Sequence, residues 1–302
     1  MKYKDWLKQW LELFVKPTTK LRTYSKYKQQ VRQYICPNLG NYEMIDITPL
    51  VLQSFVVELQ KILSANSVNG VISVLKSSLN RAVKFKVCER QFSDSIIRPK
   101  IREKNIESFT MEEQKKIEQY ILNNKRKRLL GIIVCLYTGL RIGELLALSW
   151  EDIDFNKSLI NVSKNCHDSW SDGKYIKIID TTKTKSSRRI IPVPKQILSM
   201  FKTLRKNSNS NYVIYGRTEY GAEVRIYQRS FDMLLKKLDI PHKGFHSLRH
   251  TFATRALECG MDVKTLSEIL GHKNPTVTLN RYAHSMLEHK VEMMNRLGKL
   301  LK

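Results

Sequence analysis

The stretch TGLRIGELLAL, residues 138–148, decides how the second half of the chain folds. An apolar helical run begins at Leu129 and is broken at Gly139, and helical spacing then resumes as far as Leu148. Beyond it the period changes, and short strands are predicted at 159–162, 175–179 and 188–193, with turn residues between them. We therefore predict a small antiparallel sheet that follows a broken apolar helix.

Outward from this stretch, the apolar pattern indicates two domains. Thr110 followed by Glu113 forms a capping box, so a domain begins near residue 108. Residues 93–107 lose periodicity and are polar and basic, which favours a linker, and the chain before them shows only helical patterns. Helices are also predicted at 196–204, 224–238, 247–259, 263–270 and 277–282, with a last one after residue 284.

The fold class that follows is mainly α with a small antiparallel β-sheet. The predicted parts are a helical domain at 1–92, a basic linker at 93–107, a mixed α/β domain at 108–285 and a C-terminal helix at 286–302. Thr18 or Thr19 is expected to cap the second helix, and Thr48 with Pro49 to begin a later one.

Charge separates this chain from most enzymes. It carries 53 Lys and Arg against 28 Asp and Glu, a formal net charge of +25, and both predicted domains share the excess. Binding to a phosphate backbone is the leading explanation. No apolar run approaches the roughly 20 residues that span a bilayer, and no signal peptide is indicated. Five scattered cysteines without a CxxC fit reduced thiols, so we expect a cytoplasmic protein.

Arginine and histidine concentrate in three short segments. HSLRHTFAT places His246 and Arg249 on one helical face, TGLR contains Arg141, and LGH ends at His272. Two arginines on rigid helices are well suited to bind a phosphate, because guanidinium stays charged and donates hydrogen bonds from a planar fork. Histidine can carry a proton near neutral pH. The alternative is that each arginine pairs with a buried carboxylate, and Glu144 is the candidate beside Arg141.

The nucleophile is not decided by spacing alone. Tyr282, in RYAH, follows His272 by ten residues, and cations nearby would make its phenol a competent nucleophile. His246 and His250 have the spacing of a zinc helix, but Ser247 stands where such a helix has glutamate, so no metal is expected. His250 is predicted to be a packed core histidine.

Two other features have no predicted role in chemistry. No nucleotide-binding loop occurs in the sequence. Cys166 and His167 are assigned to a polar loop without a function.

Together, TGLRIGELLAL, HSLRHTFAT, LGH and RYAH resemble the ordered signature segments of the tyrosine recombinases, the phage integrase family. The resemblance covers the whole chain and implies a helical core-binding domain followed by the mixed catalytic domain. It implies a site-specific DNA recombinase that cuts and rejoins strands through a 3′-phosphotyrosine, without metal, ATP or other cofactor. A DNA invertase, an Xer-like resolvase, a type IB topoisomerase and a non-catalytic DNA-binding protein remain alternatives.

The resemblance also implies roles for individual residues. Tyr282 would be the nucleophile, and His246 would accept its proton. Arg141 and Arg249 would clamp the phosphate, and His272 would hydrogen-bond a non-bridging oxygen. Glu144 would orient the arginine and histidine. Lys183 would protonate the leaving 5′ oxygen, with Lys185 as the rival.

DNA and further subunits are the implied partners. The implied DNA contacts are Lys76, Arg81, Lys84, Arg98, Lys100, Arg102, Lys185 and Arg188. We expect double-stranded DNA with inverted core-type sites, a homotetramer on that DNA joined by the C-terminal helix, and an accessory excision or DNA-bending protein. A mobile element in a bacterial, nucleoid-associated setting is implied. Since the chain opens with the core-binding domain, regulation at arm-type sites is not expected.

Overall fold

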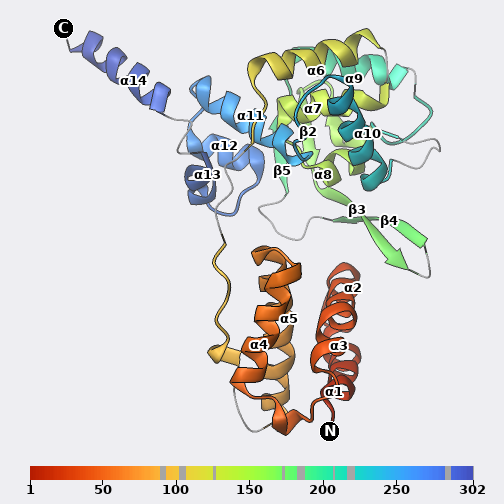
Figure 1. Cartoon of the computed structure of the whole chain (residues 1–302). Coiled ribbons are helices and arrows are strands. Elements are labelled where there is room, and N and C mark those ends of the chain that lie inside the picture. Colours follow the sequence, from red (N-terminus) through yellow and green to blue (C-terminus); the bar gives the residue numbers. More distant parts are fainter. Residues whose placement is uncertain are drawn as a thin grey trace. The chain divides into compact units, whose positions relative to one another are not determined.

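The computed structural model describes residues 1–88, 93–101, 107–124, 127–171, 174–181, 188–206, 208–215, 222–282 and 287–301. The chain divides into two compact units, Met1–Lys104 and Asn105–Lys302 (Figure 1). This division lies inside the predicted linker, and the predicted boundary between residues 285 and 286 lies outside the described residues. No helix in the described part of the chain has the length and apolarity needed to cross a membrane.

The regular elements in the described part of the first unit are helices. Its α-helices are α1 (Tyr3–Trp10), α2 (Leu21–Gln30), α3 (Cys36–Leu39), α4 (Pro49–Ile62) and α5 (Ala65–Lys84). Short π-helical turns extend α1 and α2 at Leu11–Val15 and Val31–Ile35. One face of α1 is buried through Trp6, Leu7 and Trp10, as the helical spacing of these residues requires.

The starts of two helices test the capping predictions. Thr48 accepts a hydrogen bond from the Val51 amide, and Pro49 is the first residue of α4, so this cap is confirmed. The predicted cap at Thr18 or Thr19 is wrong. Their hydroxyls donate back to the carbonyls of Phe14 and Val15, four residues earlier. They therefore close the preceding helix and leave the start of α2 without a side-chain cap.

The described part of the linker packs on α5. Ile96 is buried in the core of the first unit. The Asn69 side-chain amide donates to the Pro99 carbonyl at 3.1 Å, and Arg98 donates to the Asn69 carbonyl and the Ser73 hydroxyl. Residues 93–101 are thus part of the first unit's surface, although their sequence shows no period.

The second unit combines helices with short strands. Its helices are α6 (Met111–Asn123), α7 (Leu130–Thr138), α8 (Ile142–Ala147), α9 (Lys195–Lys206), α10 (Val224–Lys237), α11 (His246–Glu258), α12 (Val263–Leu270), α13 (Pro275–Tyr282) and α14 (Leu287–Leu300). Its strands are β1 (Ile153–Asp154), β2 (Leu159–Val162), β3 (Lys164–Ser171), β4 (Lys174–Thr181) and β5 (Arg189–Pro192). The capping box of Thr110 and Glu113 is present at the start of α6.

The strands form two antiparallel sheets, where the sequence predicted one. β2 lies between β1 and β5, and within the described residues β3 pairs with β4 alone. The prediction missed β3 and assigned Cys166 and His167 to a polar loop. Both residues are buried and pair with Ile179 and Ile178 of β4. The strand escaped detection because KNCHDSWS has no alternation of apolar and polar residues.

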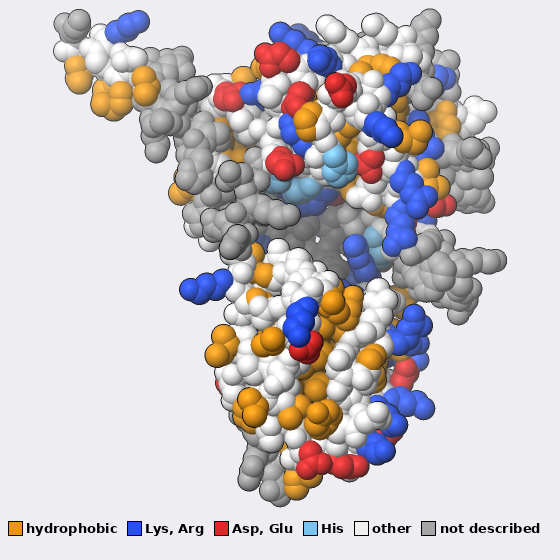
Figure 2. Space-filling view, viewed as in Figure 1, with side chains coloured by type: hydrophobic (Ala, Val, Ile, Leu, Met, Phe, Trp, Pro, Cys, Tyr) orange, Lys and Arg blue, Asp and Glu red, His pale blue; other side chains and the backbone are white. Residues whose placement is uncertain are grey.

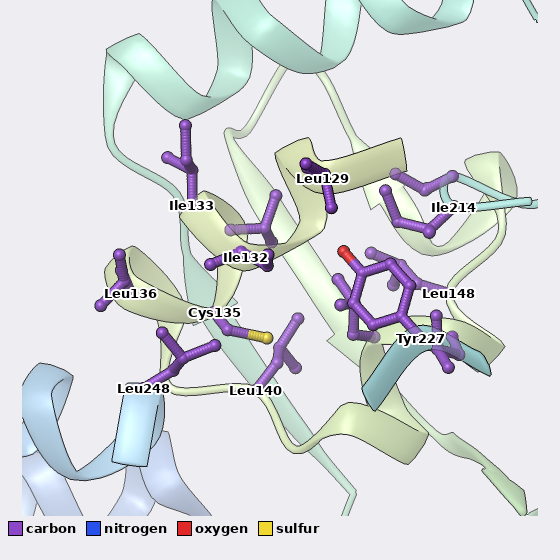
Figure 3. Packing of buried hydrophobic residues seen from close by; sticks show 14 of the residues in the cluster. Leu129, Ile132, Ile133, Cys135, Leu136, Leu140, Leu148, Ile214, Tyr227 and Leu248 are labelled. Atoms are coloured by element: carbon purple, nitrogen blue, oxygen red, sulfur yellow. The ribbon is translucent and has the colours of Figure 1, made fainter. Parts of the chain in front are cut away.

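The core of the second unit explains the two glycines of α7 and its turn. Figure 3 shows the apolar side chains of α7 gathered with Tyr227 of α10. A Cβ atom on Gly131 would lie 2.5 Å from the Tyr227 hydroxyl. Gly139 has φ of 64°, and a Cβ there would lie 2.6 Å from the Phe252 ring. Glycine is therefore required where α7 ends, and the chain turns directly into Arg141.

Candidate active site

Arg141 is fixed at the start of α8 by Glu144. Its backbone amide donates to Glu144 Oε2 at 2.9 Å, and its Nη1 donates to Oε1 at 2.8 Å. The Glu144 side chain is 3% exposed, whereas that of Arg141 is 35% exposed. The carboxylate thus anchors the guanidinium of a side chain that is still partly exposed.

Glu144 has a second partner that the sequence analysis did not select. Arg189 donates from Nη1 to Oε1 at 3.0 Å and from Nη2 to Oε2 at 2.8 Å. Burial alone would raise the pKa of the Glu144 carboxyl, but the hydrogen bonds and charge of Arg189, followed by the charge of Arg141, lower it to about 2. Glu144 is therefore ionised at any working pH.

The two-residue period of the strand could have identified Arg189 as a buried residue. Arg189 and Ile191 are two residues apart on β5 and share its inward face, while Arg188 and Ile190 are exposed on the other face. The prediction selected Arg188 for DNA contact and passed over Arg189. Because side chains alternate along a strand, the residue two positions before the buried Ile191 also faces inward, and that residue is Arg189.

Arg249 lies on α11 with 2% of its surface exposed. It donates to the carbonyl oxygens of Gly139 and Leu270, and its Nη2 lies 3.1 Å from His272 Nε2. Burial, and then the charge of Arg141, lowers the pKa of the Arg249 guanidinium to about 9. It remains a cation at neutral pH, held by neutral acceptors.

His272 joins this arginine to α13. Its Nδ1 lies 2.7 Å from the hydroxyl of Thr278, which is fully buried. Thr278 is four residues before Tyr282, so the two side chains project from the same side of α13. The imidazole is held at both ring nitrogens, which fixes its orientation.

Tyr282 contacts His250 through its hydroxyl. The Oη atom lies 2.7 Å from His250 Nδ1, and the phenol is 3% exposed within a small cluster that includes Ala253 and Leu257 of α11. The rings of His250 and His246 meet edge to face at 4.7 Å. The phenol is therefore covered, with one imidazole at its oxygen.

The predicted partner of the phenol was His246, and His250 was predicted to be a core histidine. In the structure His250 is half-buried against Tyr282, and His246 is the exposed first residue of α11, so the proton-acceptor role of His246 stays a prediction. The two histidines lie one turn apart on the same face. The level at which α13 meets α11 decides between them, and this level depends on tertiary packing.

The contacts form a closed circuit between two helices. α11 supplies Arg249 and His250, α13 supplies Thr278 and Tyr282, and His272 connects them. Tyr282 is close enough to Arg249 to influence the pKa of its guanidinium. In the described part of the chain, no three His, Cys, Asp or Glu side chains gather as a metal site would require. The groups at this site that can take part in a reaction are a phenol, imidazoles and guanidiniums held in fixed positions.

The remaining predicted residues are basic side chains of both units. Lys183, Lys185 and Arg102 lie outside the described residues. Figure 2 shows Lys and Arg side chains at the surface of both units. Lys84, Lys100 and Arg188 are exposed, and Arg81 is exposed with its guanidinium 5.1 Å from the Phe14 ring centroid.

Two predicted DNA contacts are engaged within the first unit. Lys76 is 22% exposed and lies 3.8 Å from Asp94. Arg98 is bound to α5 as described above. Their charges therefore help to hold the linker.

Comparison with known proteins places these features in context. The Phage integrase family matches residues 101–289, and the Phage integrase, N-terminal SAM-like domain matches residues 2–60. A tyrosine recombinase XerC-like protein from Caldanaerobacter subterraneus subsp. tengcongensis is 29% identical over 98% of this chain and 82% of its own length.

Solved structures show the same fold. The Tn1549 transposon integrase bound to transposon right end DNA is 25% identical, with a TM-score of 0.81, over 99% of this chain and 100% of its own. A lambda integrase tetramer bound to a Holliday junction is 18% identical, with a TM-score of 0.72, over 91% of this chain and 79% of its own.

Proposed function

Because the chain belongs to the phage integrase family, we propose that Tyr282 is the residue with which it cuts and rejoins DNA. The chain is a tyrosine-type site-specific recombinase. The observation that supports Tyr282 is its hydroxyl, which lies against His250 in the circuit that contains Arg249 and His272.

In the proposed step, the Tyr282 oxygen attacks the scissile phosphorus and the bond from phosphorus to the 5′ oxygen breaks. The phenolic proton passes to His250, and the leaving 5′ oxygen takes a proton from Lys183, a role that rests on the family resemblance. Arg141 and Arg249 stabilise the negative charge on the non-bridging oxygens. Because the phenol is 3% exposed, DNA binding must first uncover it.

The test of this function is covalent trapping on a duplex nicked at the candidate site, in EDTA and without nucleotide. The expected product is a protein bonded to the 3′ end of the cut strand, followed by recombinant DNA when a partner strand is supplied. A chain that binds the duplex but never forms the adduct would contradict the proposal. Relaxation of supercoiled DNA by a monomer, without recombinants, would instead favour a topoisomerase.

We also propose the partners of the reaction. The Tn1549 integrase is bound to transposon DNA and lambda integrase forms a tetramer on a Holliday junction. This chain is proposed to act likewise on double-stranded DNA with inverted core-type sites, as a homotetramer at the bacterial nucleoid, with an accessory excision or DNA-bending protein. Arg81, Lys84, Lys100 and Arg188 would contact phosphates, since they are exposed cations.

An Xer-like resolvase is the second candidate. The XerC-like relative, which matches nearly the whole chain, favours it. Substrate geometry distinguishes the candidates: a resolvase separates two directly repeated sites on one circle, whereas an integrase joins sites on two molecules. The purified chain is given the same two sites, either as direct repeats on one circle or on two separate molecules. The substrate that yields recombinant product identifies the reaction.

The C-terminal helix yields a prediction about assembly. α14 exposes Val291, Met294 and Leu297, and Leu301 follows it, with exposed fractions between 48% and 78%. We expect removal of residues 286–302 to leave DNA binding largely intact but to abolish stable synapsis, because the apolar face would no longer dock on a neighbouring subunit. Gel-shift and synapsis assays on the same duplex measure the two properties separately.

A matched pair of substitutions controls for the truncation. M294K, which places a charge on the apolar face, is expected to lose synapsis, whereas K299A on the same helix retains it. A truncated chain that recombines at the normal rate would contradict this role for α14.

The two histidines of α11 yield a second prediction. H250A is expected to slow single-turnover cleavage by about 10²-fold or more, since a positioned proton acceptor contributes about 10²- to 10⁴-fold. H246A is expected to have the smaller effect. H242A is the control, because His242 is an exposed histidine of the same unit, 3.3 Å from Asp232. Cleavage at the normal rate by a folded H250A protein would return the proton-acceptor role to His246.

A further inference from the structure

The carboxyl end of α12 is bound by three arginines. Arg189 donates from Nε to the carbonyl of Ile269, Arg249 donates to that of Leu270, and Arg141 Nη2 lies 3.5 Å from that of Gly271. The three acceptors are consecutive in the sequence, and the three donors come from separate elements. Carbonyls of a last helical turn lack partners within the helix and favour cations.

The local backbone makes these acceptors available. Gly271 ends α12 in the left-handed conformation, with φ of 65°, and its carbonyl and the two before it are the oxygens that the arginines reach. His272 follows at once and contacts Arg249. Residues 269–272 therefore form a fixed platform that holds the three guanidiniums at set positions.

Arg189, like Arg141, reaches both supports of the site, Glu144 and the end of α12, but it is the more deeply buried of the two. Its Nε binds the platform, and its two Nη atoms bind both oxygens of Glu144, the residue that anchors Arg141. The Arg189 side chain is only 6% exposed. It is oriented toward protein acceptors within the unit, which separates it from the exposed Arg188 beside it.

Because Arg141 and Arg189 share Glu144, Arg189 also affects how available the Arg141 guanidinium is to a phosphate. Arg189 supplies a full positive charge and two hydrogen bonds to the carboxylate, while Arg141 supplies one side-chain hydrogen bond. If Arg189 were absent, the buried carboxylate would lose two hydrogen bonds and would depend more on Arg141 for neutralisation. Arg141 would then be held more tightly to Glu144 and offer less charge to a phosphate.

We propose that Arg189 is a positioning residue that sets the spacing and availability of the Arg141 and Arg249 guanidiniums by holding Glu144 and the end of α12 together. The proposal rests on the proposed function, in which these guanidiniums clamp the scissile phosphate.

The test compares R189M, R189K and a control arginine by single-turnover cleavage and by DNA affinity. R189M is expected to slow cleavage at saturating DNA by about 10²-fold, the order that a misplacement of about 1 Å costs, with DNA affinity changed less than about threefold. R189K is expected to recover part of the rate, because the ammonium restores the charge without the planar fork.

R255M is the matched control. Arg255 lies on α11, binds both oxygens of Glu258 and the Phe109 carbonyl, and is 24% exposed. Its loss is expected to lower thermal stability while the folded protein cleaves at the normal rate. A merely structural Arg189 would behave in the same way.

The outcomes separate this inference from the proposed function. If R189M folds and cleaves at the wild-type rate, the positioning role is overturned. If R189M does not fold, R189K takes its place: its cleavage rate is expected to be below that of wild type, and a wild-type rate overturns the positioning role. The absence of an adduct with the wild-type chain, or its persistence in Y282F, would instead defeat the proposed function.

Discussion

Tyr282→Phe is expected to abolish the covalent protein–DNA adduct completely and to leave DNA binding unchanged within about twofold, because the substitution removes only the attacking oxygen. The aromatic ring keeps its place in the cluster with Ala253 and Leu257. The lost contact is the hydroxyl bond to His250. The measurement is adduct formation on the nicked duplex, with a gel shift on the intact duplex beside it.

Tyr227→Phe is the matched control for this loss. Tyr227 is also a buried tyrosine of the second unit, and its hydroxyl donates to the Arg128 carbonyl at 2.9 Å. This substitution also removes one buried hydroxyl, but far from the candidate site in the sequence and with a different partner. Y227F should still form the adduct. An adduct that forms in Y282F at a measurable rate would exclude Tyr282 as the nucleophile.

The second large effect is expected at the two clamping arginines. Arg141→Lys and Arg249→Lys should each slow cleavage at saturating DNA by about 10²- to 10³-fold, equivalent to about 3–4 kcal/mol of transition-state stabilisation. Lysine keeps the charge but lacks the planar fork. An ammonium also cannot reproduce the Arg249 contacts with two carbonyls and His272 together.

The two substitutions differ in their expected cost to stability. Arg249 is 2% exposed, so R249K leaves buried carbonyls without their donor and is expected to lower the melting temperature as well. The Arg141 side chain is 35% exposed, so R141K should fold nearly as well as wild type. R141K is therefore the cleaner test of catalysis. A folded R141K protein that cleaves at the wild-type rate would contradict the clamp.

The sequence predicted features that depend on neighbouring residues. Gly139 ends α7, as its place in the apolar run indicated, and this turn presents Arg141. The spacing of three residues between Arg141 and Glu144 brought them together at the start of α8. Capping boxes and helix starts of this kind are local, so propensity and hydrogen-bonding rules suffice to find them.

The sequence could not predict contacts that depend on how elements pack. Arg189 meets Glu144 across 45 residues, and nothing in the sequence fixes that distance. His250 rather than His246 meets Tyr282 because α13 packs one turn further along α11. Strand β3 was missed because its polar residues gain a partner only in β4.

The identity of the amino acid that becomes bonded to DNA decides whether Tyr282 is the nucleophile. After trapping on the nicked duplex, proteolysis and mass spectrometry of the DNA-bound peptide locate the ester, and end-labelling shows which end of the cut strand is attached. We expect one phosphate ester, on the Tyr282 oxygen, joined to the 3′ end. An ester on another side chain, or a link to the 5′ end, would contradict this expectation.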